Sequence, residues 1–129
     1  MGLTLVQEGH VSFLEGPSGE PLMESVEDVR SVLEQYLSHR VTAVLLYAPN
    51  LTANFFDLRS GEAGAVLQKL FQYRVRLAIV CTPGIIRPGS RFGEVLVEEE
   101  SRGRMGLFDS AESARAWIAR VQGGDRIRR

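Results

Sequence analysis

The chain opens with two stretches in which apolar and polar residues alternate. They lie on either side of Gly9-His10, and their two-residue spacing is typical of half-buried β-strands. The pattern therefore predicts a hairpin of two strands, over 3–8 and 10–15. The "GPSGEP" that follows (16–21) has the glycines and prolines of a turn.

Three continuous apolar runs occur further along the chain. They are "VTAVLLYA" (41–48), "VRLAIVC" (75–81) and "RMGLF" (104–108). Such runs are typical of strands that a parallel sheet buries on both faces. We therefore expect three further strands at these positions.

Apolar residues that recur every three to four positions predict four helices. The first covers about 26–39, and Ser60 can cap the second. The third runs from Ser90 to about Ser101, and the fourth starts at "DSAE" (109–112). The predicted inward face of the first helix consists of Val26, Val29, Leu33, Tyr36 and Leu37.

The element order β-β-α-β-α-β-α-β-α predicts one α/β domain over 1–122, followed by a flexible basic tail over 123–129. Strands separated by single helices are joined by right-handed crossovers and lie parallel. The expected fold is a single-layer mixed sheet of about five strands with four helices, in which the central strands are parallel. Ligands bind such sheets outside the carboxyl ends of the strands, near a switch in strand order, where the loops 49–59, 82–90 and 109–110 should lie.

Composition narrows the classes of function. The 129 residues, 44% hydrophobic and 24% charged, suffice for one core, and the net charge of -1 gives no global attraction to nucleic acid or an anionic membrane. Nucleic acid is therefore not an expected partner. Cys81 is the only cysteine, which excludes an internal disulfide. With no signal-peptide pattern and no membrane-length apolar run, we expect a soluble cytoplasmic protein without a membrane partner.

The segment "NFFDLRSG" (54–61) is the strongest candidate for a functional surface, because it should lie at the carboxyl edge of the sheet. One of its adjacent aromatic residues can fill the top of the core while the other faces a partner; burial of both is the alternative. Asp57 can hold loop backbone, pair with Arg74 or Arg76, or join Arg59 in an anion site. The candidate ligand or partner surface is Asn54, Phe55, Phe56, Asp57, Arg59, Ser60, Gly61, Thr82 and Arg87.

The stretch "FFDLRSGEAGAVLQKLFQYRVRLAIV" (55–80) resembles the signature of a bacterial domain-of-unknown-function family, numbered 4180. The resemblance extends to "EEESRGRMGLF" (98–108) and "SAESARAWI" (110–118), so it covers most of 40–120. One departure is the Glu-Glu-Ser at 99–101, where the family tends to have Glu-x-Asn, so the chain lacks that amide. The family resemblance implies no particular activity.

The element order and the "AxxWI" ending also resemble STAS-like domains, the fold of sulfate-transporter and anti-sigma-factor-antagonist domains. In the sigma-factor regulators of that group a serine at the start of the corresponding helix is phosphorylated. The resemblance would assign this role to Ser60. The alternative is that Ser60 only caps its helix.

No catalytic or cofactor motif is visible, because the sequence lacks a glycine-rich phosphate loop, a metal-ligand spacing and a nucleophile elbow. His10 and His39 fall at a predicted turn and a helix end, away from the carboxyl-edge loops. The sequence therefore favours a non-catalytic regulatory or protein-interaction module without a cofactor. Its protein partner is unknown, and a homodimer could cover the edge of the sheet. The alternative is a protein that binds a small anion or phosphorylated metabolite, or an unrecognised enzyme, through the carboxyl-edge loops.

Overall fold

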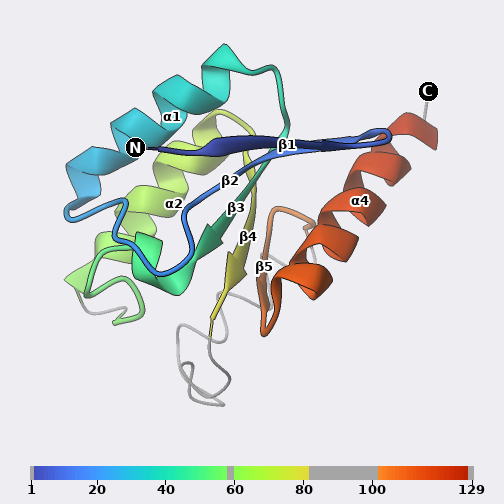
Figure 1. Cartoon of the computed structure of the whole chain (residues 1–129). Coiled ribbons are helices and arrows are strands. Elements are labelled where there is room, and N and C mark those ends of the chain that lie inside the picture. Colours follow the sequence, from blue (N-terminus) through green and yellow to red (C-terminus); the bar gives the residue numbers. More distant parts are fainter. Residues whose placement is uncertain (1, 58–59, 82–101, 128–129) are drawn as a thin grey trace.

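Figure 1 shows the chain in a computed structural model that describes residues 2–57, 60–81 and 102–127. The strands are β1 (Thr4–Glu8), β2 (Val11–Glu15), β3 (Ala43–Tyr47), β4 (Arg76–Val80) and β5 (Met105–Phe108). The α-helices are α1 (Val29–Ser38), α2 (Glu62–Gln72) and α4 (Ala111–Ile127). Two short 3-10 helices, η1 (Val26–Asp28) and η2 (Ala48–Asn50), lie before α1 and after β3.

The sequence predicted all five strands and the three α-helices found in the described residues. The fourth predicted helix, over 90–101, lies outside those residues. Helix α4 continues to Ile127, so the backbone is helical through most of the segment 123–129 that was expected to be a tail.

The five strands form one mixed sheet in the order β1-β2-β3-β4-β5. β1 pairs with β2 in antiparallel fashion, and all later neighbours pair in parallel. The predicted parallel core is therefore confirmed. The strands follow one another in the sheet in the same order as in the sequence, so the order of the described strands does not reverse. The ligand crevice that such a reversal creates is therefore absent from the described part of the sheet.

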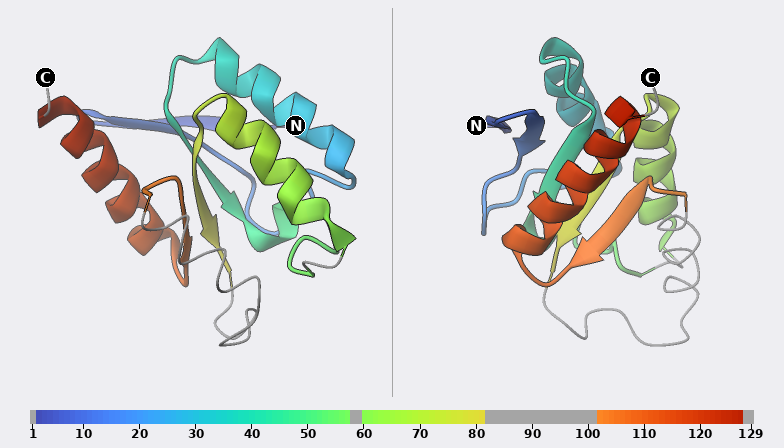
Figure 2. Two further views of the ribbon diagram at one scale, coloured as in Figure 1. Left: turned by 180° about the vertical axis from the view of Figure 1, so that it is seen from behind. Right: turned by 90° about the vertical axis from the view of Figure 1, so that its right-hand side faces the viewer.

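Helices cover both faces of the sheet. Figure 2 shows α1 and α2 side by side on one face and α4 on the other. Right-handed crossovers between parallel strands placed in sequence order put the connecting helices on the same face, as α1 and α2 are. After β5 the chain folds α4 over the opposite face, which would otherwise expose a second apolar surface to water.

Successive residues of the central strands point to opposite faces of the sheet, where they form two separate hydrophobic cores. The core under α1 and α2 takes Leu14, Val44, Leu46, Leu77, Ile79 and Met105 from the strands. The core under α4 contains Phe13, Ala43, Leu45, Ala78, Ala114, Trp117 and Ile118. Each large apolar side chain buried in this way contributes roughly 1.5–3 kcal/mol to folding. Trp117 of α4 also packs on Phe108 of β5, with ring centroids 5.7 Å apart.

Asn50, at the end of η2, ties the turn after β2 to the carboxyl end of β3. Its side chain is completely buried (0% exposed). Nδ2 donates to the carbonyl oxygens of Pro17 (2.6 Å) and Glu20 (2.8 Å), and Oδ1 accepts the N–H of Tyr47 (2.7 Å). The carbonyl oxygen of Asn50 accepts the N–H of Met23 (2.7 Å). One amide side chain therefore satisfies three backbone groups that would otherwise be unpaired.

Gly16 makes this arrangement possible. A Cβ at this position would collide with Oδ1 of Asn50. The N–H of Gly16 donates to the carbonyl oxygen of Leu45 at 2.9 Å, so the backbone is held close to β3. Residue 16 must therefore lack a side chain if Asn50 is to keep its bonds.

Gln122 of α4 fixes the part of the hairpin that extends past β3. β2 pairs with β3 only at Leu14 and Glu15. Further back, Nε2 of Gln122 donates to the carbonyl oxygen of Ser12 (2.8 Å) and Oε1 accepts the N–H of Ser12 (3.3 Å). The amide side chain thus replaces the missing neighbour of β2, as an amide can both donate and accept.

Replacing Asn50 by Ala should lower the free energy of unfolding by about 3 kcal/mol, because a fully buried amide is removed and three backbone groups lose their hydrogen-bond partner. Urea unfolding followed by circular dichroism would measure the change. Asn54→Ala is the matched control: this asparagine is exposed, so its loss should change stability by less than about 0.5 kcal/mol. Equal effects of the two variants would contradict the role given to Asn50.

Candidate functional site

The predicted aromatic pair lies at the end of the core under α1 and α2. Phe55 is completely buried (0% exposed), and Phe56 is partly buried and packs against the same core. Their rings meet edge to face with centroids 5.2 Å apart. The pair therefore closes the core at the carboxyl edge of the sheet, and Phe55 offers no surface to a partner.

The side chain of Ser60 holds the loop in a closed turn. The hydroxyl of Ser60 lies 2.9 Å from the carbonyl oxygen of Asn54 and 2.8 Å from that of Asp57, and it accepts the N–H of Glu62 (3.1 Å). The N-cap residue of α2 is Gly61, with a positive φ of 77°, and not Ser60 as the sequence predicted. A serine with these bonds stabilises the start of α2 in the unphosphorylated chain.

The structure separates several residues that sequence reasoning had joined. Arg74 and Arg76 follow the carboxyl end of α2, whereas Asp57 precedes its amino end. Neither arginine can therefore pair with Asp57 across the length of the helix. Arg59, Thr82 and Arg87 lie outside the described residues, so the anion site predicted around Arg59 stays a prediction.

A polar network that the sequence analysis missed lies at the carboxyl edge, on the face covered by α4. The hydroxyl of Tyr47 donates to Oε2 of Glu15 (2.6 Å), and Nη2 of Arg115 donates to Oε1 of Glu15 (2.7 Å). Glu15 and Tyr47 end neighbouring strands, and Arg115 lies in the second turn of α4. The network therefore joins β2, β3 and α4. That two polar residues end adjacent parallel strands was the signal that could have revealed it.

The network changes the acidity of Tyr47. Burial and the hydrogen bond to Glu15 raise the pKa of Tyr47 from 10.0 to about 12, because a tyrosinate would be poorly solvated and would face a carboxylate. The same hydrogen bond raises the pKa of Arg115. At neutral pH Tyr47 is therefore a hydrogen-bond donor and not a base.

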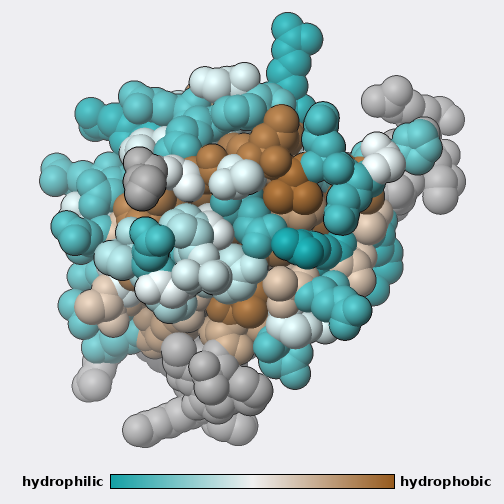
Figure 3. All heavy atoms as spheres, viewed as in Figure 1, coloured by the Kyte–Doolittle hydropathy of each residue, from teal (hydrophilic) through white to brown (hydrophobic). Residues whose placement is uncertain are grey.

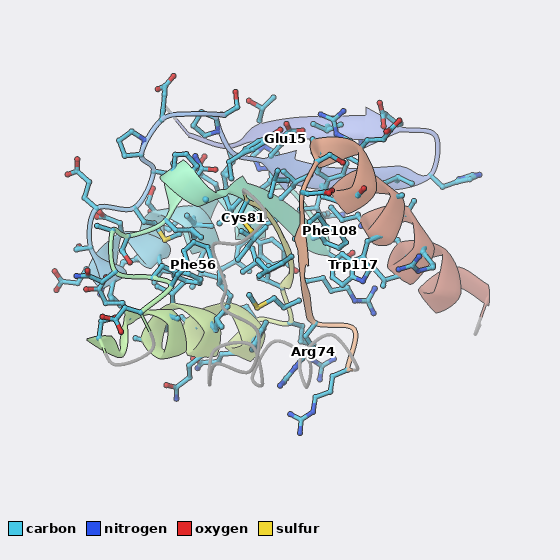
Figure 4. The ribbon with its side chains drawn as sticks, turned by 90° about the horizontal axis from the view of Figure 1, so that it is seen from below. Glu15, Phe56, Arg74, Cys81, Phe108 and Trp117 are labelled. Carbon is cyan, nitrogen blue, oxygen red and sulfur yellow. The ribbon has the colours of Figure 1, made fainter. Side chains whose placement is uncertain are left out.

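A shallow cavity of about 320 Å³ lies beside this network. It is lined by Gly19, Tyr47, Ala48, Pro49, Val80, Cys81 and Asp109. Burial raises the pKa of the Cys81 thiol, so the reactive thiolate is disfavoured at neutral pH. Figure 4 shows Cys81 and Phe56 on one side of the sheet, and Phe108 and Trp117 on the side of α4. Within the described residues, no group of His, Cys, Asp or Glu could hold a metal ion.

A larger apolar cavity of about 470 Å³ runs along the outer side of α1 and α2. Leu37 of α1 is 59% exposed, and Tyr73, the residue after α2, is 44% exposed. The helical pattern had placed Leu37 on the inward face, and this prediction was wrong. The helix packs through Val29, Val32, Leu33 and Tyr36, which leaves Leu37 at the margin of the apolar stripe. We call this surface the α1/α2 groove; it is lined by Val26, Glu27, Val29, Arg30, Leu33, Glu34, Leu37, Ala65, Gln68, Lys69, Gln72 and Tyr73.

A smaller apolar surface lies at the β1 edge of the sheet. Leu5 of β1 is 39% exposed. Figure 3 shows hydrophobic atoms at the surface near the β1–β2 hairpin, among hydrophilic ones. In the part of the chain that the structure describes, no helix has the length and apolar character needed to cross a membrane.

Comparison with known proteins identifies the family. The family model for a domain of unknown function (DUF4180) matches residues 8–118. The match covers most of the chain, which therefore belongs to this family, as the signature predicted. No curated protein and no solved structure matches the chain, so the resemblance to STAS-like domains rests on the order of elements and the "AxxWI" ending alone.

Truncation of Phe55 to Ala should destabilise the protein by about 3–5 kcal/mol, because it empties a fully buried site. Phe56→Ala should cost clearly less, since part of that ring is already in water. Chemical denaturation of both variants would measure the difference. If Phe55→Ala is as stable as the wild type, the Phe55 ring does not belong to the core, and the hypothesis that it faces a partner regains support.

Tyr47 should ionise at about pH 12, well above its usual value of 10.0. The difference in tyrosinate absorbance between wild type and Tyr47→Phe gives its titration curve. Glu15→Gln should move the midpoint towards lower pH, because the neighbouring carboxylate is removed. The raised pKa stabilises the folded state fully below pH 10, and this contribution is lost as the pH rises through about 12. A wild-type midpoint near pH 10 would show that the network does not form.

Proposed function

We propose that this member of the DUF4180 family is a non-catalytic regulatory module that binds an amphipathic helix of a partner protein in the α1/α2 groove. The observation that carries the proposal is the exposure of Leu37 (59%) and Tyr73 (44%) on either side of this groove. A third helix laid between two exposed helices is a recurrent mode of protein recognition, and it buries apolar side chains spaced at i, i+3 or i+4, and i+7.

The charges along the groove favour one kind of partner. Glu27 and Glu34 line it on the side of α1, with Arg30 between them, and Lys69 lines it on the side of α2. A partner helix that complements this pattern would carry basic residues along the edge that faces α1 and an acidic residue opposite Lys69. Charge complementarity of this kind sets the orientation and the choice of partner more than the affinity.

The arrangement of reactive groups argues against catalysis. Tyr47 and Arg115 each donate a hydrogen bond to Glu15, and these bonds join β2, β3 and α4. His10 lies in the β1–β2 turn and His39 directly after α1, at the amino ends of β2 and β3, whereas Cys81 follows the carboxyl end of β4. A Cys/His pair would therefore have to span the sheet.

Two expectations from the sequence stand beside this proposal. The likeness of the element order to STAS-like domains is in line with a regulatory role, as an analogy of fold. A homodimer would cover β1, which is an edge of the sheet and a surface separate from the α1/α2 groove. Self-association through β1 stays a prediction.

A photo-crosslinking amino acid at position 37 should trap a partner in cells, and the same group at position 120, an exposed site on α4, should not. Mapping the crosslinked peptide by mass spectrometry should reveal an amphipathic helix with apolar residues at the spacing given above. Tyr73→Glu should reduce the crosslink at least about tenfold, since it places a charge at one of the two exposed apolar side chains that the partner helix would cover. Its free energy of unfolding should change by less than about 0.5 kcal/mol, because the side chain is exposed.

Three outcomes would refute the proposal. The crosslink could be as frequent from position 120, it could be unaffected by Tyr73→Glu, or its target could lack the amphipathic pattern. A crosslink to the groove of a second copy of this chain would replace the partner helix by self-association.

A further inference from the structure

A third cavity, of about 550 Å³, lies at the opposite edge of the sheet, beside the amino ends of the parallel strands. Its size is within the range of small-ligand sites. Every charged side chain described in its lining is an arginine. The lining consists of Thr42, Phe71, Arg74, Val75, Arg76, Arg102, Gly103 and Arg104. A chain with a net charge of only -1 thus gathers four guanidinium groups around one hollow.

Two of these guanidinium groups are held in place by the fold. Nη1 of Arg76 donates to the carbonyl oxygen of Val121 in α4 (3.1 Å). The guanidinium carbon of Arg104 lies 4.6 Å above the centre of the Phe71 ring, which is a cation–π contact. Groups that are fixed before a ligand arrives lose less conformational entropy when it binds.

Arg74 occupies a position at which the backbone favours glycine. The N–H of Arg74 bonds to the carbonyl oxygen of Phe71 (3.0 Å), and that of Val75 bonds to Leu70 (3.1 Å). These are the two bonds of the motif that ends many helices, in which the residue at the place of Arg74 is usually glycine. Arg74 has a φ of 60°, a left-handed conformation that a Cβ disfavours.

We propose that this cavity, which we call the arginine cavity, binds a small molecule through a diphosphate group. Guanidinium groups bind phosphate oxygens through two parallel N–H donors, and four of them suit a ligand with more than one anionic group. The basic side chains surround one hollow and do not form a stripe along the surface, which favours a small molecule over a nucleic-acid strand. The site is separate from the α1/α2 groove.

Figure 4 shows Arg74 beside the turn that leads into β5. The chain also offers a matched control for it. Arg40, in the turn between α1 and β3, has a φ of 53° and is exposed, but it does not line the arginine cavity. Arg74→Gly and Arg40→Gly therefore remove the same charge and relieve the same backbone strain, in two turns that each lead from a helix into a parallel strand.

Calorimetric titration with inorganic pyrophosphate, at an ionic strength of about 0.15 M, tests the proposal. Wild type and Arg40→Gly should bind alike, and Arg74→Gly should bind at least about tenfold more weakly. Both glycine variants should melt at the wild-type temperature or above it, because glycine adopts a positive φ without a steric penalty. Arg102→Gln, at an exposed position, should weaken binding to a similar degree without relying on a backbone change.

The proposal is overturned if pyrophosphate does not bind the wild type at millimolar concentration, or if Arg74→Gly and Arg102→Gln both bind it like the wild type. Equal weakening by Arg40→Gly would mean that only the overall charge matters. A single-stranded oligonucleotide that binds more tightly than pyrophosphate, and loses affinity in Arg74→Gly, would assign the cavity to nucleic acid instead. None of these results depends on whether a helix binds in the α1/α2 groove.

Discussion

The burial of the central strands on both faces is the constraint on which the rest of the structure depends. Residues Ala43 to Leu46 of β3 have no exposed surface, and neither have Leu77 to Ile79 of β4. Such strands are stable only if helices cover both sides of the sheet. α1 and α2 on one face and α4 on the other meet this requirement, and every site described above lies at an edge or on the outer surface of those layers.

The two edges of the parallel strands differ in chemical character. At the carboxyl edge, Asn50 and the network of Glu15, Tyr47 and Arg115 pair polar groups with one another. At the amino edge, arginines surround a cavity. The general preference of α/β sheets for ligands at the carboxyl edge assumes a reversal in strand order, which the described strands of this sheet lack. The positive φ of Arg74 and the four arginines both occur at the amino edge, which is therefore the edge where we propose a ligand site.

The strands and helices could be predicted because burial places apolar residues at a regular spacing along the sequence. The apolar run at 41–48 predicted a strand covered on both faces, and β3 lies there. The candidate surface was less predictable. The helical spacing shows which way a side chain points but not how far the neighbouring helix covers it, so it could not show that Leu37 remains exposed in the α1/α2 groove. The partners of Asn50 are backbone groups about 30 residues away, and no pattern of residue types encodes them. The strain at Arg74 comes from its positive φ angle, which cannot be predicted from the residue type.

The bond between Gln122 and Ser12 joins residues that are 110 positions apart in the chain. β1 and β2 are synthesised first, yet the outer part of β2 has no neighbour from β3 and receives one only when α4 docks. Contacts between such distant residues slow folding, because a long loop must close before they form. Until α4 docks, the outer part of β2 therefore has no hydrogen-bond partner on the side away from β1, and the two ends of the fold are coupled through this one side chain.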